Sequence, residues 1–212
     1  MEKNDNNNMY EILYKVANRN IDNLNKVLEN SREEIVHGIV KSSNAIASSI
    51  KNGGKVIICG NGGSAAQSQH IAAEFVVRLQ AEPPLNREAY PAIALTTDTS
   101  ILTASANDFG FQEIFARQIE ALGRKGDILI VISTSGNSEN VYKAARKATE
   151  MKIPVIGILG GDGGKLKEIS TIPVIVSSCN TQRVQEIHMN IGHSIVENVE
   201  EILSNRFQRD AV

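Results

Sequence analysis

The first fifty residues carry hydrophobic side chains at the spacing of amphipathic helices. Apolar residues recur at three- and four-residue intervals over Met9–Glu29, and this pattern predicts a helix. A second helix is predicted from about Arg32 to Lys51, and the Gly53-Gly54 pair ends it. We expect these helices to form an arm of residues 1–52. Because the arm has two apolar faces, it is a reason to expect an oligomer.

After residue 53 the pattern changes to short aliphatic runs separated by segments with helical spacing. Strands that alternate with helices indicate βαβ units. We therefore expect residues 53–212 to form one α/β domain with a doubly wound, five-stranded parallel sheet and helices on both faces. A long C-terminal helix is predicted from about Thr181 to Phe207. The predicted strands are Val56–Cys59, Ala92–Leu95, Asp127–Ile132, Val155–Leu159 and Ile172–Val176.

Charge and composition exclude several classes of partner. Lys plus Arg number 22 and Asp plus Glu number 24 in 212 residues, so the formal charge is −2. No basic excess is available to neutralise a phosphate backbone, and we expect neither nucleic acid nor an anionic membrane as a partner. With no Trp, 4 Tyr and 5 Phe, the chain is also poorly equipped to stack bases or sugars. A bound sugar would be held by polar side chains and backbone.

Cysteine usage and hydropathy favour a cytoplasmic location. Cys59 and Cys179 lie 120 positions apart and in no metal-binding spacing, which fits a reducing compartment. We find neither an apolar stretch typical of a signal peptide nor a run long enough to cross a bilayer.

A glycine-rich loop follows the first predicted strand. Its sequence, Cys59-Gly-Asn-Gly-Gly-Ser64, permits a tight turn into a helix whose first amides can meet an anion. Gly60, Gly62 and Ala65 also match the G-x-G-x-x-A form of the dinucleotide fingerprint. That fingerprint requires an acidic residue at the end of the second strand, yet Asp98 comes 33 positions after Ala65. The loop therefore does not favour a nicotinamide cofactor.

A second polar loop follows the third predicted strand. Within six residues it carries four hydroxyl side chains and no lysine, a composition that suits a phosphate monoester held by neutral donors at a helix N-terminus. Capping of the next helix is the alternative, but it needs only one of these side chains. The hydroxyl residues are Ser133, Thr134, Ser135 and Ser138.

Two helices carry groups that could move protons or bind a metal. His70 and Glu74 are four residues apart, which places both on one face of a helix. On the final helix Gln185 and His193 are separated by two turns, about 80° apart around the axis, and His188 points away from His193. These side chains could supply a general base, a general acid and three or four zinc ligands. Purely structural histidines remain the alternative.

In these two loops and in the two helices with histidines, the chain resembles the sugar isomerase (SIS) domain family. The resemblance extends over roughly Tyr10–Ile202. Its site residues resemble the branch that converts sedoheptulose 7-phosphate to D-glycero-D-manno-heptose 7-phosphate, a precursor of lipopolysaccharide or capsule heptose. The matching segments are Cys59–Ser64, Gln69–Glu74, Pro91–Asp98 continuing to Asn107–Gly110, Gly126–Ser138, and Arg183–His188 with His193.

The resemblance implies a role for each matching residue. Glu74 would be the base and His193 the acid of an aldose–ketose isomerase. One Zn²⁺ per subunit would be held by His70, Glu74, Gln185 and His193. The substrate would be a sugar phosphate. Its phosphate would contact Ser133, Thr134, Ser135 and Ser138, and the rest of it Asn61, Gly62, Gly63, Glu74, Asn107, Asp108 and Gln185.

The resemblance also implies a homotetramer with the first two helices in its core and the active sites between subunits. Gln182 departs from some relatives, which have an acidic residue there, and a supporting role at this position is not expected. Two alternatives stay open. One is a non-catalytic SIS protein of the replication-initiator-associating type, against which Glu74 and His193 argue. The other is an isomerase of a different ketose phosphate.

Overall fold

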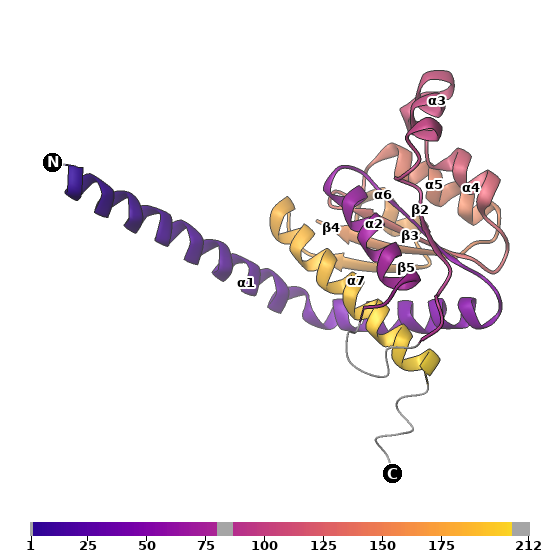
Figure 1. Cartoon of the computed structure of the whole chain (residues 1–212), viewed down its shortest axis with the longest axis horizontal. Coiled ribbons are helices and arrows are strands. Elements are labelled where there is room, and N and C mark those ends of the chain that lie inside the picture. Colours follow the sequence, from indigo (N-terminus) through magenta and orange to yellow (C-terminus); the bar gives the residue numbers. More distant parts are fainter. Residues whose placement is uncertain (1, 80–86, 205–212) are drawn as a thin grey trace, which may run out of the picture.

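The chain folds around one five-stranded parallel sheet. The computed structural model describes residues 2–79 and 87–204, and Figure 1 shows helices on both faces of the sheet. The strand order is β2-β1-β3-β4-β5. This confirms the predicted doubly wound α/β fold, and each observed strand lies within one residue of its predicted bounds. The strands are β1 (Val56–Gly60), β2 (Ala92–Ala94), β3 (Ile128–Ser133), β4 (Val155–Gly160) and β5 (Ile172–Val176).

The central strands are buried on both faces, as is typical of a parallel sheet covered by helices. Every residue of β1, β3 and β4 is buried. Successive side chains point to opposite layers, so Ile58 packs with α1, α2 and α7, and Ile57 packs with α4, α5 and α6. The helices are α1 (Glu2–Lys51), α2 (Gly63–Val76), α3 (Thr99–Phe109), α4 (Ala116–Leu122), α5 (Glu139–Glu150), α6 (Gly164–Ile169) and α7 (Thr181–Ser204).

The strand order reverses between β1 and β3, and this arrangement determines where a ligand can bind. The two strands pair in parallel from Val56 opposite Ile128 to Gly60 opposite Ile132. Their carboxyl ends are therefore adjacent, and the chain leaves them toward helices on opposite faces. Open α/β sheets bind ligands in the crevice outside such a reversal. The glycine-rich loop and the hydroxyl-rich loop both begin here.

The predicted break between the first two helices is wrong. The helix α1 runs unbroken for 50 residues, and its first half projects from the body of the molecule (Figure 1). The residues at the predicted break, Asn30 and Ser31, include neither glycine nor proline, so the backbone continues as a helix. The Ser31 hydroxyl instead accepts a hydrogen bond from the backbone N–H of Ser177, at 3.1 Å.

The two halves of α1 have different surroundings. The helix packs on β5 and α7; Leu24 and Leu28 are partly buried against the core, and Ile35 and Ile46 belong to it. In the projecting half Tyr10 and Leu13 are exposed. The predicted end of the C-terminal helix at Phe207 lies outside the described residues, within which α7 extends to Ser204. Among the described helices, none combines the length and apolar character needed to span a membrane.

Candidate active site at the carboxyl ends of the central strands

The loop after β1 turns sharply at a glycine. Gly62 has φ 54° and ψ −120°, a backbone conformation that L side chains rarely adopt. The helix α2 starts at the next residue, and no side chain caps it. Backbone amides at the beginning of α2 therefore face the crevice without a built-in anionic partner, which suits a polar ligand.

A reciprocal amide pair connects this loop to the start of α5. Asn61 Nδ2 donates to Asn140 Oδ1 at 2.7 Å, and Asn140 Nδ2 donates to Asn61 Oδ1 at 2.8 Å. Asn140 is buried, and its Oδ1 also accepts from the backbone N–H of Val141. The pair fixes the orientation of Asn61, a predicted substrate contact. The sequence analysis missed Asn140, although a polar residue on the apolar face of a predicted helix was a usable signal.

The hydroxyl-rich loop does not use the Ser138 side chain to cap the helix that follows. Ser138 is the N-cap residue of α5, but its side chain makes no capping hydrogen bond. Its nearest hydroxyl partner is Ser133 Oγ at 3.4 Å, and Ser133 Oγ also accepts from the backbone N–H of Gly136 at 3.1 Å. In the same turn, Thr134 is half-buried and Ser135 is exposed. The capping alternative does not use the Ser138 hydroxyl.

A hollow between these two loops can take a small polar ligand. Its volume is about 420 Å³, and it opens at the crevice between β1 and β3. Both loops contribute to its wall, together with the 3₁₀ turn η1 (Phe111–Glu113). The lining residues are Asn61, Phe111, Gln112, Ser138, Glu139 and Asn140.

Two histidines from different helices meet beside the crevice. His70 on α2 and His193 on α7 approach with their Nε2 atoms 2.8 Å apart, and the rings lie edge to face at 67°. A hydrogen bond between two imidazole nitrogens requires one donor and one acceptor, so at least one ring is neutral in this arrangement. Gly192 helps to bring the helices together, because a Cβ at this position would collide with Ile71.

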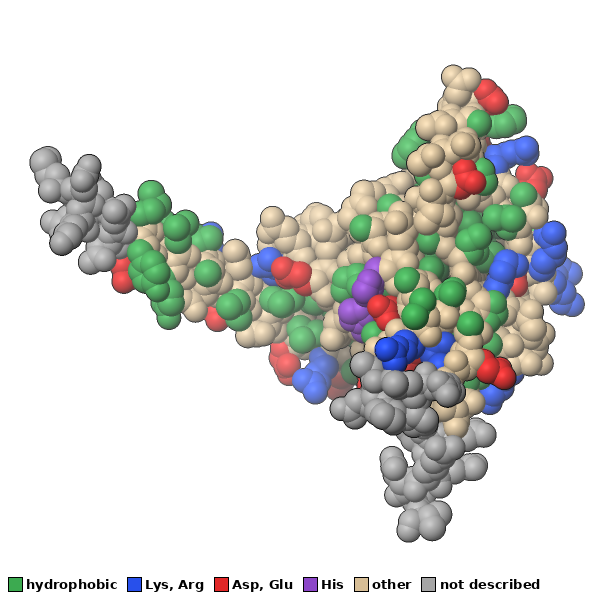
Figure 2. Space-filling model, viewed as in Figure 1, with side chains coloured by type: hydrophobic (Ala, Val, Ile, Leu, Met, Phe, Trp, Pro, Cys, Tyr) green, Lys and Arg blue, Asp and Glu red, His purple; other side chains and the backbone are tan. Residues whose placement is uncertain are grey.

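A carboxylate completes the cluster. Glu74 Oε1 lies 3.4 Å from His70 Nε2, and the Glu74 side chain is 19% exposed. Figure 2 shows histidine side chains at the surface beside acidic and basic ones. Helical spacing predicted the pairing of His70 with Glu74, and the structure brings His193 from α7 to them. The three side chains place an acceptor and two titratable rings within reach of one substrate.

Gln185, the fourth predicted zinc ligand, lies on the same side of α7 but has different contacts. Its backbone carbonyl accepts a hydrogen bond from Gln67 Nε2 at 2.8 Å. Its side-chain amide lies against Gly63, where a Cβ would collide with it. The absence of a side chain at Gly63 thus makes room for Gln185 at the start of α2.

The candidate ligands are of the chemical types that bind zinc, but their positions match a zinc site only in part. Two imidazole nitrogens and a carboxylate oxygen are ligands that Zn²⁺ prefers, and His70, Glu74 and His193 supply them together. Across the described parts of the chain, no three His, Cys, Asp or Glu side chains form a ready metal site. The Gln185 amide would have to turn away from Gly63 to join them.

The remaining predicted residues lie apart from this cluster. Asn107 and Asp108 are exposed near the end of α3, which stands away from the body in Figure 1, and Asn107 Nδ2 donates to Asp108 Oδ1 at 2.8 Å. Within residues 2–79 and 87–204, no hydrogen bond joins either residue to the other predicted site residues. His188 is fully buried, and this burial lowers its pKa to about 4, while the nearby Leu159 carbonyl opposes the shift.

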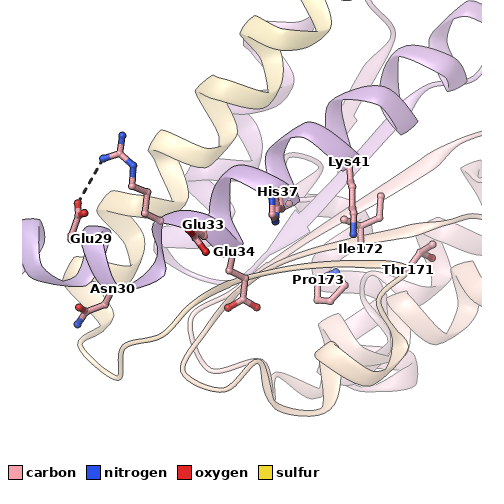
Figure 3. A pocket seen from close by; sticks show the side chains of 11 residues that line it. Glu29, Asn30, Glu33, Glu34, His37, Lys41, Thr171, Ile172 and Pro173 are labelled. Carbon is pink, nitrogen blue, oxygen red and sulfur yellow. Dashed lines mark ion pairs between the residues drawn. The ribbon is translucent and has the colours of Figure 1, made fainter.

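A larger hollow lies away from both loops, and none of the predicted site residues lines it. Its volume is about 850 Å³, and it lies between α1 and the beginning of β5 (Figure 3). Thr171 and Ile172 mark the amino end of that strand, opposite the edge where parallel sheets bind ligands. Glu33, Glu34 and His37 contribute polar side chains from α1.

Comparison of the sequence with known proteins finds one domain family and, among its members, one kind of enzyme. A sequence-family profile described as "SIS domain" matches residues 20–160. The phosphoheptose isomerase of Clostridium acetobutylicum is 56% identical over 153 residues, which cover 72% of this chain and 76% of that protein. The phosphoheptose isomerase of Helicobacter pylori strain Shi470 is 45% identical over 85% of this chain and 92% of its own length.

The structure is similar to solved phosphoheptose isomerases. The enzyme GmhA from Neisseria gonorrhoeae matches with a TM-score of 0.82 and 36% identity, and the match covers 89% of this chain and 99% of that one. The enzyme from Francisella tularensis matches with a TM-score of 0.80 and 35% identity, covering 89% and 98%.

Proposed function

The chain belongs to the SIS domain family, and from that membership we propose that it is a phosphoheptose isomerase. It interconverts sedoheptulose 7-phosphate and D-glycero-D-manno-heptose 7-phosphate for heptose precursor synthesis. The observation that carries this proposal is the cluster of His70, Glu74 and His193, found in the same chain as a hydroxyl-rich loop whose Ser138 side chain does not cap its helix. The similarity to phosphoheptose isomerases extends over most of the chain.

The phosphate group binds at the hydroxyl-rich loop. Ser133, Thr134, Ser135 and Ser138 donate hydrogen bonds to it, and the amino end of α5 adds a favourable dipole. The phosphate is remote from the carbons that react, so this contact fixes the position of the sugar along the crevice. Asn61, oriented by its amide pair with Asn140, contacts the sugar hydroxyls, as do the backbone groups of Gly62 and Gly63.

Isomerisation needs a base for carbon and a group that moves a proton between oxygens. The Glu74 carboxylate removes a proton from C1 of the ketose and returns it to C2 through an enediol. His193 donates a proton to the C2 oxygen as the carbonyl there is lost, and it then accepts the proton that leaves the C1 hydroxyl as the new carbonyl forms. Each positioned group contributes roughly 10²–10⁴-fold to the rate. The His70–His193 contact keeps both rings oriented toward Glu74.

We further propose one Zn²⁺ per subunit at this cluster. His70, Glu74 and His193 would hold it, with Gln185 as the fourth ligand after its amide leaves Gly63. When bound, the ion would supply a positive charge that polarises or orients the carbonyl end of the sugar.

The expected assembly is a homotetramer in the cytoplasm, with Asn107 and Asp108 contributing to a substrate site between subunits. The exposed apolar side chains of the projecting half of α1 support an oligomer, since a monomer would leave them in water. Replacing Tyr10 and Leu13 by Glu should lower the mass measured by sedimentation equilibrium. An unchanged mass would contradict this role of the arm.

The experiment that tests the function is a product assay across five-, six- and seven-carbon ketose phosphates. Wild-type protein should convert the seven-carbon substrate with the highest kcat/KM, and Glu74→Gln should lower kcat about 10²–10⁴-fold. Glu120→Gln, an exposed carboxylate on α4 paired with Arg117, is the matched control and should keep wild-type activity. A higher kcat/KM for a shorter ketose phosphate would mean that this shorter sugar, and not the seven-carbon one, is the substrate. Conversion by Glu74→Gln at the wild-type rate would exclude the base assignment.

A non-catalytic regulatory protein is the competing function. It would bind a partner such as a replication initiator and show no isomerase activity in the same assay. Glu74 and His193 argue against it, because a binding protein has no need for a carboxylate and an imidazole gathered around His70.

A further inference from the structure

The proposed base lies in the last turn of a helix whose C-cap, Val77, makes only a backbone hydrogen bond to the Ala73 carbonyl. α2 ends at Val76, its last turn carries no basic side chain, and Glu74 comes two residues before the end. The final carbonyls of a helix have no intrahelical partners, and a terminal turn without other support frays. Something outside α2 therefore has to hold the backbone of Glu74.

Arg87 provides that support from a distant point in the chain. Its Nη2 donates to the backbone carbonyl of Glu74 at 2.6 Å, and the next carbonyl, that of Phe75, accepts from the Tyr90 N–H at 3.1 Å. The guanidinium stacks on the Tyr90 ring, 4.2 Å from its centroid, and Nη1 donates to the Glu88 carbonyl. A cation at this end of a helix is also favoured by the helix dipole.

Glu200 extends the connection to the helix that carries the proposed acid. Arg87 Nε and Glu200 Oε1 are 2.6 Å apart, and the two side chains are 9% and 2% exposed. The same carboxylate oxygen accepts from the Leu79 N–H at 3.1 Å. Glu200 lies seven residues after His193, so both side chains are on one face of α7.

We propose that Arg87 and Glu200 are positioning residues, which set the placement of the base Glu74 relative to the acid His193. Arg87 contacts the Glu74 backbone through one nitrogen and α7 through another. The planar guanidinium fixes the angle between these two bonds. The inference rests on the proposed isomerase activity, because it concerns the groups assigned to that reaction.

A buried ion pair that merely stabilises the fold is the competing explanation, and a matched control separates the two. Lys55 and Asp127 also form an ion pair, at 2.6 Å, with Asp127 4% exposed. That pair lies at the amino ends of β1 and β3, opposite the site. Arg87→Met and Lys55→Met each leave a buried carboxylate without its cation, so both variants should lose comparable thermal stability.

The two variants should differ in catalysis. Below the melting temperature of both, Arg87→Met should lower kcat about 10²-fold with KM within about threefold of wild type, the cost of misplacing a reacting group by about 1 Å. Lys55→Met should keep both constants within about threefold. Arg87→Lys keeps the charge for Glu200, but its donors lie on one nitrogen and cannot reproduce the separate Nε and Nη2 contacts, so kcat should be intermediate. A kcat that follows the melting temperature in all three variants would overturn the proposal.

The double variant Arg87→Met/Glu200→Met sharpens the test. Removing both charges takes away the unpaired buried carboxylate, so the melting temperature should recover relative to Arg87→Met. The Glu74 carbonyl would still lack its donor, and kcat should stay low. Recovery of kcat together with stability would show that the ion pair acts on the fold alone.

The tests distinguish failure of the proposed isomerase activity from failure of the positioning role. If wild-type protein converts no ketose phosphate, the activity is wrong, and crystal structures of wild type and Arg87→Met decide the positioning role. We expect the Glu74–His193 separation to change in Arg87→Met and not in Lys55→Met. An unchanged separation would refute the role irrespective of any reaction.

Discussion

Replacing Ser138 by Ala should separate phosphate binding from helix capping. Loss of an N-cap serine ordinarily costs about 1 kcal/mol of stability. Ser138, however, makes no capping hydrogen bond, and its hydroxyl has only a 3.4 Å contact with Ser133 Oγ. We therefore expect the free energy of unfolding of Ser138→Ala to stay within about 0.5 kcal/mol of wild type.

The effect on substrate binding should be large by comparison. A hydrogen bond from a hydroxyl to a charged group contributes about 1.5–3 kcal/mol, and each 1.4 kcal/mol is about tenfold in affinity, so KM should rise roughly 10- to 150-fold. Because the phosphate is bound equally in ground and transition states, kcat should change little. Steady-state kinetics gives both constants, and inhibition by inorganic phosphate reports the same site without the sugar.

A true capping residue calibrates the stability measurement. Asp98 caps α3, where its Oδ1 accepts from the Ile101 N–H at 2.9 Å, so Asp98→Ala should cost about 1 kcal/mol in urea unfolding. If Ser138→Ala is destabilised as much as Asp98→Ala and its KM is unchanged, the hydroxyl serves the helix and the phosphate assignment is refuted.

Two further predictions concern pH and metal. Burial holds the pKa of His188 at about 4 in the folded chain, below its ordinary 6.5, so the unfolded chain binds the proton first as the pH falls. The free energy of unfolding should therefore drop by about 3 kcal/mol between pH 6.5 and pH 4. Urea unfolding of His188→Leu should show a smaller drop over the same pH range. An equal drop would mean that another group causes the acid sensitivity. Elemental analysis of protein purified without chelator should find one zinc per subunit, and His193→Ala should lose most of it. Wild-type protein without zinc would refute the proposed metal site.

The sequence predicted the sheet well because its strands are buried on both faces. The aliphatic runs that became β1, β3 and β4 are bounded by glycine or polar residues, so their limits were readable. The unbroken α1 was missed because residues 29–34 are all polar, and the buried position among them is Ser31 and not an apolar residue. A polar gap in the apolar pattern looks the same, in the sequence, as a break in the helix.

The site was predictable where the chemistry lies on one element and unpredictable where it depends on packing. Loop composition indicated Asn61 and Ser138, and helical spacing paired His70 with Glu74. The 2.8 Å approach of His193 depends on how closely α7 packs on α2, and helix periodicity contains no such information. Arg87 contacts the backbone of Glu74 across a separation of thirteen residues, so no local sequence pattern connects the two.

The continuity of α1 has a consequence for how this chain can vary between species. Each residue added to a helix advances it by about 1.5 Å and turns everything beyond it by about 100°. A single insertion near Asn30 would therefore rotate the exposed side chains of Tyr10 and Leu13 to another side of the molecule. If this segment contacts another subunit as proposed, substitutions that keep its apolar side chains should be tolerated among related chains, whereas insertions and deletions of one or two residues should be rare.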